Sequence, residues 1–411
     1  MQDQNTKLRI AFLHPDLGIG GAEQLVVNLA VALQQKGHFV KIYTPHHDPN
    51  HCFKETRDGT LNVEVRGSIF PREIMKKFTA LCAMIRMILA ALYVILYGGK
   101  YDVVIVDQVS ACVPLLRLFN RRVIFYCHFP DKLLCVDRRS PLKRLYRFFL
   151  DLFEEITTGF ANLVLVNSGF TKEVFKNSFK ILNKLGINPD ILYPALDLSK
   201  FDNVPPADEF IKKIGGPFFL SLNRYERKKG IGLAIQAYSE FKKKVGKTEY
   251  KLVIAGGYDT RVTENVEHLE ELRELAKKEG LIEGQDIHFL CSVSDVERAN
   301  LLKNCFCVLY TPENEHFGIV PTEAMYMERP VIACNSGGPK ESVLNGKTGY
   351  LLEPNPKQWG EKMFEMTQNP QIIKQMGIEG RKNVKERFGL EAFANQLNNC
   401  VLSVVSKQKR D

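Results

Sequence analysis

The sequence predicts an α/β protein made of two doubly wound domains, each built on a parallel sheet. Short runs rich in β-branched residues alternate with amphipathic helical stretches along most of the 411 residues. These runs are almost continuously hydrophobic, which is typical of parallel strands that helices cover on both faces. The alternation stops between 194 and 217 and then starts again, and a chain of this length is too long for one compact core.

The strand candidates fall into two groups, one in each half of the chain. The first group is LRIAFL at 8–13, FVKIYT at 39–44, DVVIVD at 102–107, RVIFYC at 122–127 and LVLVN at 163–167. The second is PFFLSLN at 217–223, KLVIAGG at 251–257, DIHFL at 286–290, FCVLYT at 306–311 and PVIAC at 330–334.

The segment between the two groups is rich in Pro, Asp and Gly, as a linker would be. We therefore expect an N-terminal domain over 1–198 and a C-terminal domain over 199–385. Residues 386–411 predict a C-terminal helix and a basic tail without a strand, which packs on the outside or crosses back to the first domain.

A mostly apolar stretch at 78–97 interrupts the pattern. It is long enough for about 30 Å of helix and so for a bilayer span. A single crossing would put the strands at 8–13 and 102–107 on opposite sides of the membrane, although both belong to one predicted sheet. Arg86, near the middle, also disfavours a span. An interface helix, a buried core helix and a re-entrant hairpin remain, and we favour a membrane-interface helix at about 75–97.

The net charge of +9 indicates an anionic partner, which is nucleic acid, a phosphorylated small molecule or an acidic membrane surface. The sequence contains no nucleic-acid-binding motif, so we expect no nucleic acid partner. Lys76 and Lys77, and the amphipathic stretch at 142–153 with its Lys143, Arg144 and Arg147, favour the interface position for the helix at 78–97. A monotopic membrane protein is the resulting expectation.

Cysteine and histidine usage predicts neither disulfides nor a metal site. The ten cysteines are scattered without a C-x-x-C pair, which is typical of buried free thiols in a reducing compartment. The polar start MQDQNTKLRI predicts no secretory signal. The histidines and cysteine of HHDPNHC at 46–52 could suggest zinc, but they are crowded in one loop without regular spacing. A loop or ligand contact is favoured there.

A glycine-rich turn follows the first strand candidate. A strand, such a turn and then a helix expose backbone N–H groups at the positive end of a helix dipole, where phosphate binds. Gly18, Gly20 and Gly21 permit a close approach of the backbone. The alternative is a tight turn that binds nothing, and the lack of Gly-Lys-Ser/Thr excludes a Walker A loop.

Two cations open the second domain. Arg224 and Lys229 come directly after a strand and before a helix, which places them at the carboxyl edge of the sheet. A guanidinium fork and an ammonium point charge together suit a diphosphate. The alternative is a solvated basic turn, above all for Arg227 and Lys228.

Glu315 and Glu323 lie in TPENEHFGIVPTEAM at 311–325. If Pro321 is the first helical residue, the backbone N–H groups of 318–320 are free at the N-terminus of the helix. Glu315 then lies outside the helix and Glu323 in its first turn, so that the two carboxylates are spread along a ligand. This spread, and the absence of any D-x-D, argue against a shared metal. The carboxylates would then accept hydrogen bonds from the hydroxyls of a sugar ring and of a ribose. A capping carboxylate and a solvent-facing one are the alternative.

These motifs resemble those of the retaining GT-B glycosyltransferases of family four. The shared elements are G-G-A-E after the first strand, S-x-N-R-x-x-x-K-K after the linker, A-G-G after the next strand and E-H-F-G-I-V-P-T-E-A-M. Within that family, the resemblance is to the mannosyltransferases that extend dolichol-linked oligosaccharides, through the segments FYCHFPD, ENVEH and NSGGPKES. It runs from about residue 8 to 390. The implied fold is GT-B, with two Rossmann-like domains facing across a cleft.

The resemblance also implies an activity. Mannose would pass from GDP-mannose to Man-GlcNAc₂-diphosphodolichol, first by an α-1,3 and then by an α-1,6 bond, with retention, on the cytosolic face of the endoplasmic reticulum membrane. It implies front-face substitution without a metal or cofactor, and other mannosyltransferases of the pathway as partners. The tail KQKRD resembles a dilysine retrieval signal, or is a chance basic end. Another donor, a soluble acceptor and a catalytically silent scaffold are the competing interpretations.

Site roles follow from the same resemblance. Arg224 and Lys229 would bind the diphosphate and neutralise the leaving GDP, and His128 matches an active-site histidine near the reacting sugar, unless it is an ordinary strand-end histidine. The other donor-binding residues would be Gly20, Gly21 and Gly256, Ser292 and Val293 facing the base, Glu315 with the backbone of Phe317, Gly318 and Ile319 at the mannose, and Glu323 at the ribose.

Overall fold

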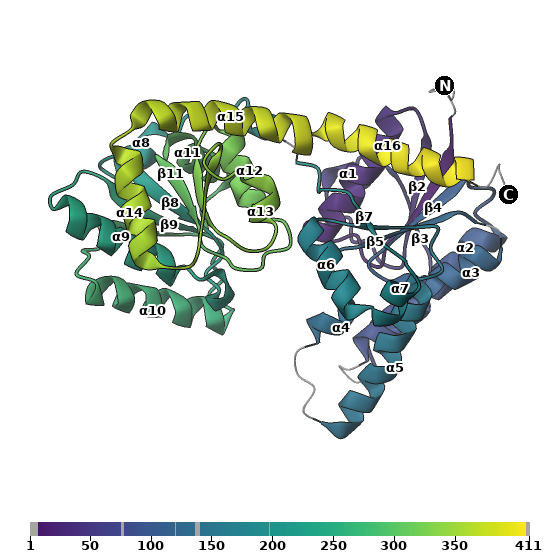
Figure 1. Cartoon of the computed structure of the whole chain (residues 1–411). Helices are drawn as coiled ribbons and strands as arrows, with labels where there is room; N and C mark the ends of the chain where they lie inside the picture. The colour runs from purple at the N-terminus through teal and green to yellow at the C-terminus, as the bar shows by residue number, and fades with distance from the viewer. Residues whose placement is uncertain (1–6, 75–77, 120, 136–139, 197, 408–411) are drawn as a thin grey trace. The chain divides into compact units, whose positions relative to one another are not determined.

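The computed structural model describes residues 7–74, 78–119, 121–135, 140–196 and 198–407. The chain divides into two compact units (Figure 1). Unit 1 comprises Met1–Ala195 and Leu390–Asp411, and unit 2 comprises Leu196–Gly389. The first unit therefore ends slightly before the expected boundary at 198, and the C-terminal segment returns to it at Leu390.

Unit 1 is built on a fully parallel sheet of β1 (Arg9–Leu13), β2 (Phe39–Thr44), β3 (Asn62–Val65), β4 (Val103–Asp107), β5 (Val123–Cys127), β6 (Leu163–Val166) and β7 (Asp190–Ile191). The strand order is β3-β2-β1-β4-β5-β6-β7, so the order reverses between β1 and β4. Its helices are α1 (Gly21–Gln35), α2 (Thr79–Leu96), α3 (Val113–Leu118), α4 (Asp131–Leu134), α5 (Pro141–Thr158), α6 (Gly169–Ser178), α7 (Lys180–Lys184) and α16 (Leu390–Lys407), with 3₁₀ turns η1 (Lys54–Thr56) and η2 (Ser110–Cys112).

Both faces of this sheet are covered, which explains the unbroken hydrophobic runs. Ile10 and Phe12 of β1 pack in one core with α1 and α16, whereas Ala11 and Leu13 pack in a second core with α2, α3 and α6. Because successive side chains of a strand point to opposite faces, a strand buried on both sides has no polar positions.

Unit 2 repeats the arrangement with β8 (Phe218–Leu222), β9 (Lys251–Gly256), β10 (Ile287–Cys291), β11 (Cys307–Tyr310), β12 (Val331–Cys334) and β13 (Gly349–Leu352), in the order β10-β9-β8-β11-β12-β13. Its helices are α8 (Asp208–Lys212), α9 (Gly232–Val245), α10 (Thr263–Lys278), α11 (Asp295–Asn304), α12 (Ile319–Tyr326), α13 (Pro339–Ser342), α14 (Pro356–Thr367) and α15 (Pro370–Phe388), with 3₁₀ turns η3 (Ser199–Phe201) and η4 (Arg227–Lys229). The predicted fold class, two doubly wound parallel-sheet domains, is confirmed.

The apolar segment at 78–97 forms α2, one face of which belongs to the core of unit 1. Met87 and Val94 are fully buried on that face, and the buried Arg86 donates to the Pro45 carbonyl at 2.6 Å. Within the described residues, α2 alone is long and apolar enough to span a membrane, and 39% of it is buried. Its outer face stays apolar and partly exposed at Leu89 and Leu92. Lys76 and Lys77 lie outside the described residues, and the interface role of α2 stays a prediction.

Candidate active site

Most of the candidate site residues follow the strands at which each sheet reverses its order. In unit 2, β8 and β11 are neighbours, and the carboxyl ends of parallel strands share one edge of the sheet. Arg224 and Lys229 follow β8, and Glu315 follows β11. In unit 1 the neighbours at the reversal are β1 and β4. Such reversal points are where open α/β sheets bind ligands.

Lys229 and Glu315 form a direct ion pair. The Lys229 Nζ lies 2.5 Å from the Glu315 Oε1, with the two side chains only 12% and 27% exposed. A second contact joins the same two segments, because the Thr311 hydroxyl just after β11 donates to the Lys229 carbonyl at 2.8 Å. The structure thus brings the predicted cation and the predicted sugar-binding carboxylate together. Sequence reasoning assigned them to different parts of the ligand and missed the pair.

The loop that carries Glu315 is held by two glycines after β12. The Gly338 N–H donates to the Glu315 carbonyl at 2.7 Å. Gly337 has φ +61°, and a Cβ there would collide with the Glu315 backbone, while a Cβ on Gly338 would collide with Phe317. Only glycine permits this approach. The sequence shows these glycines in NSGGPKES, but their contact with the glutamate loop needs the fold.

Helix α12 begins earlier than expected. Gly318, with φ +82°, is its N-cap and Ile319 its first residue, so Pro321 occupies the third position instead of the first. Proline fits there because that position's N–H has no partner in a helix. Glu323 therefore lies in the second turn rather than the first. The Phe317 ring is buried and packs on Phe388.

Glu323 is neither a cap nor solvent-facing. It is 3% exposed, its Oε2 accepts a hydrogen bond from the Arg298 guanidinium, and its Oε1 lies 3.8 Å from the Lys200 Nζ. Arg298 comes from α11, whose start is fixed by a capping box between Ser294 and Glu297. Sequence reasoning missed Arg298, because nothing local distinguishes it from a surface arginine.

Arg224 lies beside a tightly packed junction of three loops. Its side chain is 63% exposed and its Nη1 lies 2.9 Å from the Glu226 Oε1. Gly256, with φ +152°, leaves no room for a Cβ against the Asn223 carbonyl. The Gly256 carbonyl in turn accepts from the Ser292 N–H at 2.8 Å, and the half-buried Val293 follows. Gly256 therefore sets the spacing between the Arg224 and Ser292 loops.

The other basic residues of this turn have partners on the protein. Arg227 forms ion pairs with Glu267 and Glu271 of α10, at 2.8 and 2.6 Å. Lys228 lies 3.1 Å from Glu226 and is 66% exposed. The solvated-turn alternative therefore fits Lys228, whereas Arg227 is paired with α10 and the Lys229 side chain is mostly buried.

In unit 1 a buried carboxylate joins two histidines. The Asp107 Oδ2 is hydrogen-bonded to the His14 Nδ1 at 2.8 Å, and its Oδ1 lies 2.8 Å from the His128 Nε2. His14 and Asp107 are fully buried, while the His128 side chain is 23% exposed. Sequence reasoning found His128 but missed both other members, which come from the ends of β4 and β1.

The electrostatics of this group favour charged forms. Burial by itself lowers the pKa of His14, but the contacts with Asp107 and Glu23 outweigh it and raise that pKa to about 9. Burial by itself raises the pKa of Asp107, and the two histidines lower it to about 2. The buried Asp107–His14 pair is thus an ion pair at neutral pH.

The glycine turn lies beside the same group. Gly20 is the N-cap of α1 and Gly21 its first residue, in an extended backbone that leads into the helix. The Glu23 carboxylate turns back towards Gly20 and lies 3.8 Å from the His14 Nε2. The Glu23 carboxylate therefore lies at the N-terminus of α1, where the sequence predicted a phosphate.

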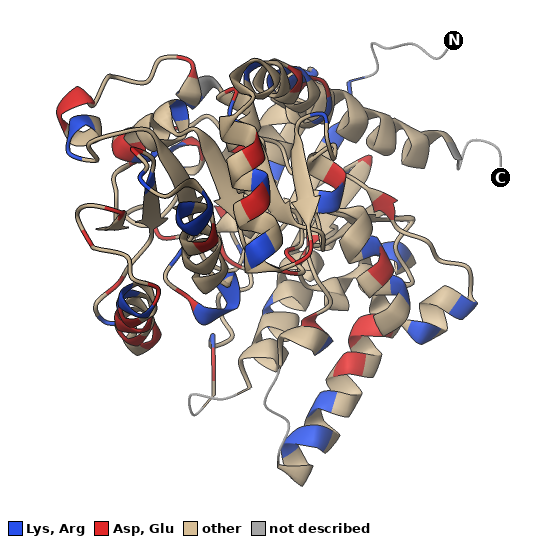
Figure 2. Ribbon diagram, turned by 60° about the vertical axis from the view of Figure 1, so that its left-hand side comes forward, with Lys and Arg blue, Asp and Glu red and all other residues tan. Residues whose placement is uncertain are grey.

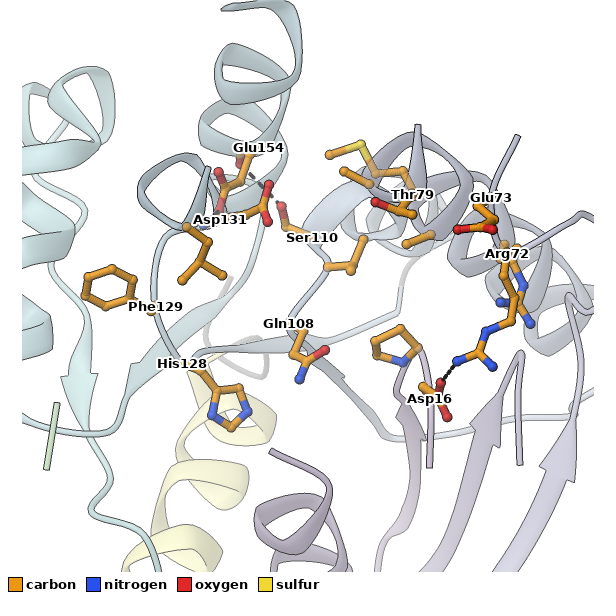
Figure 3. A pocket seen from close by; sticks show the side chains of 17 residues that line it. Asp16, Arg72, Glu73, Thr79, Gln108, Ser110, His128, Phe129, Asp131 and Glu154 are labelled. Atoms are coloured by element: carbon orange, nitrogen blue, oxygen red, sulfur yellow. Dashed lines mark hydrogen bonds and ion pairs between the residues drawn. The ribbon is translucent and has the colours of Figure 1, made fainter. Parts of the chain in front are cut away.

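A cavity of about 850 Å³ opens beside His128, which we name cavity 1 (Figure 3). Its polar lining includes Asp16, Arg72, Gln108 and His128, and its apolar lining includes Ala83, Met84 and Leu134. Glu154 of α5 reaches it and accepts the N–H groups of Asp131 and Lys132 at 2.7 and 3.1 Å. Burial raises the pKa of Glu154 to about 7.

The histidine-rich loop does not converge on an ion. The His47 Nε2 lies 3.1 Å from the Thr56 hydroxyl, and the Cys52 thiol donates to the Pro49 carbonyl. Within the described part of the chain, no three His, Cys, Asp or Glu side chains lie close enough together to hold a metal ion.

Known proteins match this chain along nearly its whole length. The model for Glycosyltransferase Family 4 matches residues 19–200, and the model for Glycosyl transferases group 1 matches 207–383. The alpha-1,3/1,6-mannosyltransferases ALG2 of Dictyostelium discoideum and Homo sapiens are both 48% identical. The first match covers 98% of this chain and 99% of the relative, the second 98% of each.

Solved structures agree in fold at lower identity. A glycosyltransferase from Rickettsia africae superposes with a TM-score of 0.72 at 18% identity, over 97% of this chain and 99% of that one. A sucrose-phosphate synthase from Thermosynechococcus elongatus gives 0.72 at 20% identity, over 98% and 100%. The chain therefore has the GT-B fold and belongs to the family of alpha-1,3/1,6-mannosyltransferases.

Proposed function

We propose that this chain transfers mannose from GDP-mannose to Man-GlcNAc₂-diphosphodolichol, first by an α-1,3 and then by an α-1,6 bond, giving Man₃-GlcNAc₂ with retention of configuration. The observation that carries the proposal is the 48% identity, across nearly both whole chains, to relatives named for these two linkages. The intact Lys229, Glu315 and Glu323 set weighs against a catalytically silent scaffold.

The donor binds to unit 2. Lys229 and Arg224 face the diphosphate, so that Lys229 exchanges its Glu315 partner for phosphate oxygens and stabilises the charge that develops on the leaving GDP. Glu315 is then free to accept hydrogen bonds from mannose hydroxyls. Glu323, held by Arg298, accepts from the ribose. In the free enzyme, the Lys229 ammonium and the Glu315 carboxylate hold each other in position. This pairing limits the reorganisation that the reaction requires.

Retention follows from front-face substitution. A double displacement needs a carboxylate beneath the anomeric carbon, and none of the candidate site residues is assigned to that position. The leaving phosphate instead takes the acceptor proton. His128, oriented by Asp107, contacts the reacting sugar. The charge on the leaving group is balanced by Arg224 and Lys229, so the proposal includes no metal or cofactor.

The acceptor binds to unit 1. Cavity 1 has both polar and apolar lining, which suits a glycan joined to a lipid. Amphipathic α5 exposes an apolar face, made of Leu142, Leu145, Phe148, Phe149, Phe153 and Ile156. Basic residues lie in its first half and acidic ones farther along (Figure 2). This face and the outer face of α2 rest on the cytosolic surface of the endoplasmic reticulum membrane.

Purified protein incubated with GDP-mannose and a lipid-linked Man-GlcNAc₂ acceptor tests the proposal. The product is expected to gain two hexoses, and digestion with linkage-specific α-mannosidases identifies the bonds. UDP-glucose in place of GDP-mannose serves as the donor control. No gain in mass with GDP-mannose would refute the proposal, and a gain of one hexose would limit it to a single linkage. Pathway partners and the retrieval role of the tail, whose residues 408–411 lie outside the described chain, need separate tests.

A further inference from the structure

Unit 1 contains a second, smaller cavity beside cavity 1. It has a volume of about 390 Å³ and lies at the glycine turn, and we name it cavity 2. Both cavities are lined by Asp16 and Arg72, whose side chains are ion-paired (Figure 3). The Asp16–Arg72 ion pair therefore lies between cavity 1 and cavity 2. The transfer proposed above places no group of the acceptor in cavity 2, although the adjacent glycine turn was predicted to approach a phosphate.

Most side chains that line cavity 2 are polar, and they include both acidic and basic groups. It includes the carboxylates of Asp16, Glu23 and Asp48, the imidazoles of His46 and His51, and the guanidinium of Arg72. Among the described residues, neither imidazole ring has a hydrogen-bond or ion-pair partner. Carboxylates accept hydrogen bonds, guanidinium donates them and imidazole does both.

This set of donors and acceptors fits a neutral ligand that carries many hydroxyl groups. The volume falls within the range of about 300–1,000 Å³ that is usual for small-ligand pockets. The carboxylates do not converge as metal ligands, because the described residues contain no group of three such side chains close enough to hold an ion. A hexose is the ligand class that the lining favours.

The two successive transfers of the proposed function create a need for such a space. The acceptor of the second transfer is larger than that of the first by the mannose just added. A site shaped for the first acceptor must hold this extra hexose during the second transfer only. We propose that cavity 2 binds, in the second transfer, the mannose that was added in the first. This inference rests on the proposed function.

Two variants of the exposed His51 test the proposal. His51→Ala, combined with Asp48→Asn, removes ring and charge contacts, while the Asn side chain keeps the acceptor for the Asn50 N–H. His51→Trp instead fills the cavity. Each is assayed with the lipid-linked Man-GlcNAc₂ acceptor and, separately, with the acceptor that already carries one added mannose.

Both variants are expected to keep the first transfer within about twofold of the parent rate and to slow the second at least tenfold, so that the product with one added hexose accumulates. The KM for the one-mannose-larger acceptor rises, while the KM for GDP-mannose stays unchanged. Asn50→Ala, in the same loop but not lining the cavity, is the matched control and should alter neither step.

Equal slowing of both transfers, or no effect on the second, would overturn the proposal. Thermal melting of each variant separates these outcomes from a loss of folding. Failure of the proposed function gives a different result, because the parent protein itself would then add no hexose to the first acceptor.

Discussion

Asp107 lies between two histidines and contacts both, with its Oδ1 2.8 Å from the His128 Nε2 and its Oδ2 2.8 Å from the His14 Nδ1. The carboxylate is fully buried, whereas His128 reaches cavity 1. The Nε2 of His128 therefore faces the protein. We expect Asp107 to act as a positioning residue that fixes the orientation of the His128 ring.

Asp107→Asn keeps the shape of the side chain and removes its charge. We expect kcat to fall by about 10²-fold, in the range usual for the loss of a positioned acid or base group. The KM for GDP-mannose should change less than kcat, because Arg224, Lys229 and Glu323, the expected contacts to the diphosphate and the ribose, lie on unit 2. Steady-state kinetics at saturating donor measure both.

Comparison with His128→Gln distinguishes positioning from a general loss of structure. If Asp107 acts through His128, the double variant is no slower than the slower single variant, because residues that act as a unit are not additive. Multiplicative effects of the two substitutions on kcat would contradict the positioning role.

The buried ion pair also predicts how stability depends on pH. The pKa of His14 is raised to about 9 in the folded protein, so its contribution is complete below the ordinary pKa of 6.5 and is lost as pH rises through 9. Over this window the free energy of unfolding should fall by about 3 kcal/mol. Asp107, with a pKa lowered to about 2, stays ionised throughout. Urea unfolding at pH 6.5, 8 and 9.5 measures the change.

His14→Gln should abolish the part of this dependence that lies above pH 8. The pKa of Glu154 is raised to about 7, so the free energy of unfolding also falls as Glu154 ionises, mainly between pH 4.5 and 7, and this change is nearly complete by pH 8. A parent protein whose stability stays constant from pH 6.5 to 9.5 would show that His14 is not charged.

Two adjacent lysines offer a matched test of the donor site. Lys229 is 12% exposed and paired with Glu315, whereas Lys228 is 66% exposed and lies beside Glu226. Lys229→Ala should lower kcat/KM for GDP-mannose by about 10³-fold or more, because it removes a cation that stabilises the leaving diphosphate. Lys228→Ala should leave kcat/KM within about twofold, as expected for an exposed pair.

Melting temperatures show whether Lys229→Ala still folds. A partly exposed ion pair contributes little to stability, about 1 kcal/mol or less, so the variant should melt close to the parent. A Lys229→Ala variant with near-normal turnover would refute the diphosphate role, and equal losses in both variants would indicate a general effect of charge.

The fold was largely predictable from the sequence because its central strands are buried on both faces. All ten expected strands form. The strands that were missed, β3, β7 and β13, each lie at the edge of a sheet. Edge strands are half exposed, as in the NVEV of β3, and so lack the continuous hydrophobic run that marks a central strand.

The site was predictable only residue by residue. Motifs identified His128, Lys229 and Glu315 because each lies at the end of a strand in a recognisable context. Their partners come from distant segments: Asp107 meets His128 only because β4 and β5 are adjacent, and Arg298 meets Glu323 only because α11 packs near α12. The spacing of residues along the sequence does not predict such contacts between distant segments.

Arg298 is expected to act on donor affinity through Glu323. Among the described residues, Arg298→Ala leaves the Glu323 carboxylate, which is 3% exposed, with Lys200 alone as a charged partner, at 3.8 Å. The KM for GDP-mannose should rise about tenfold, as expected for the loss of one charge-assisted hydrogen bond. The effect on kcat should be smaller, because the ribose does not react.

Arg298→Lys is the conservative control. It keeps the charge near Glu323 and should recover part of the affinity, although a lysine cannot reproduce the guanidinium geometry. Isothermal titration with GDP gives the same comparison without turnover. Unchanged GDP affinity in Arg298→Ala would show that the pair serves structure only.

The apolar face of α5 provides the last prediction, which concerns the membrane. Leu145 and Phe149 are 57% and 61% exposed on that face. Burying side chains of this size in a bilayer contributes about 1.5–3 kcal/mol each, so Leu145→Glu with Phe149→Glu should lower vesicle partitioning at least about 10²-fold. Sedimentation with phosphatidylcholine vesicles containing an anionic lipid measures this partitioning.

Ile372→Glu on α15, which replaces a residue 51% exposed on unit 2, is the control and should bind as the parent does. If the α5 variant still binds and Leu89→Glu with Leu92→Glu on α2 does not, the membrane contact belongs to α2 instead.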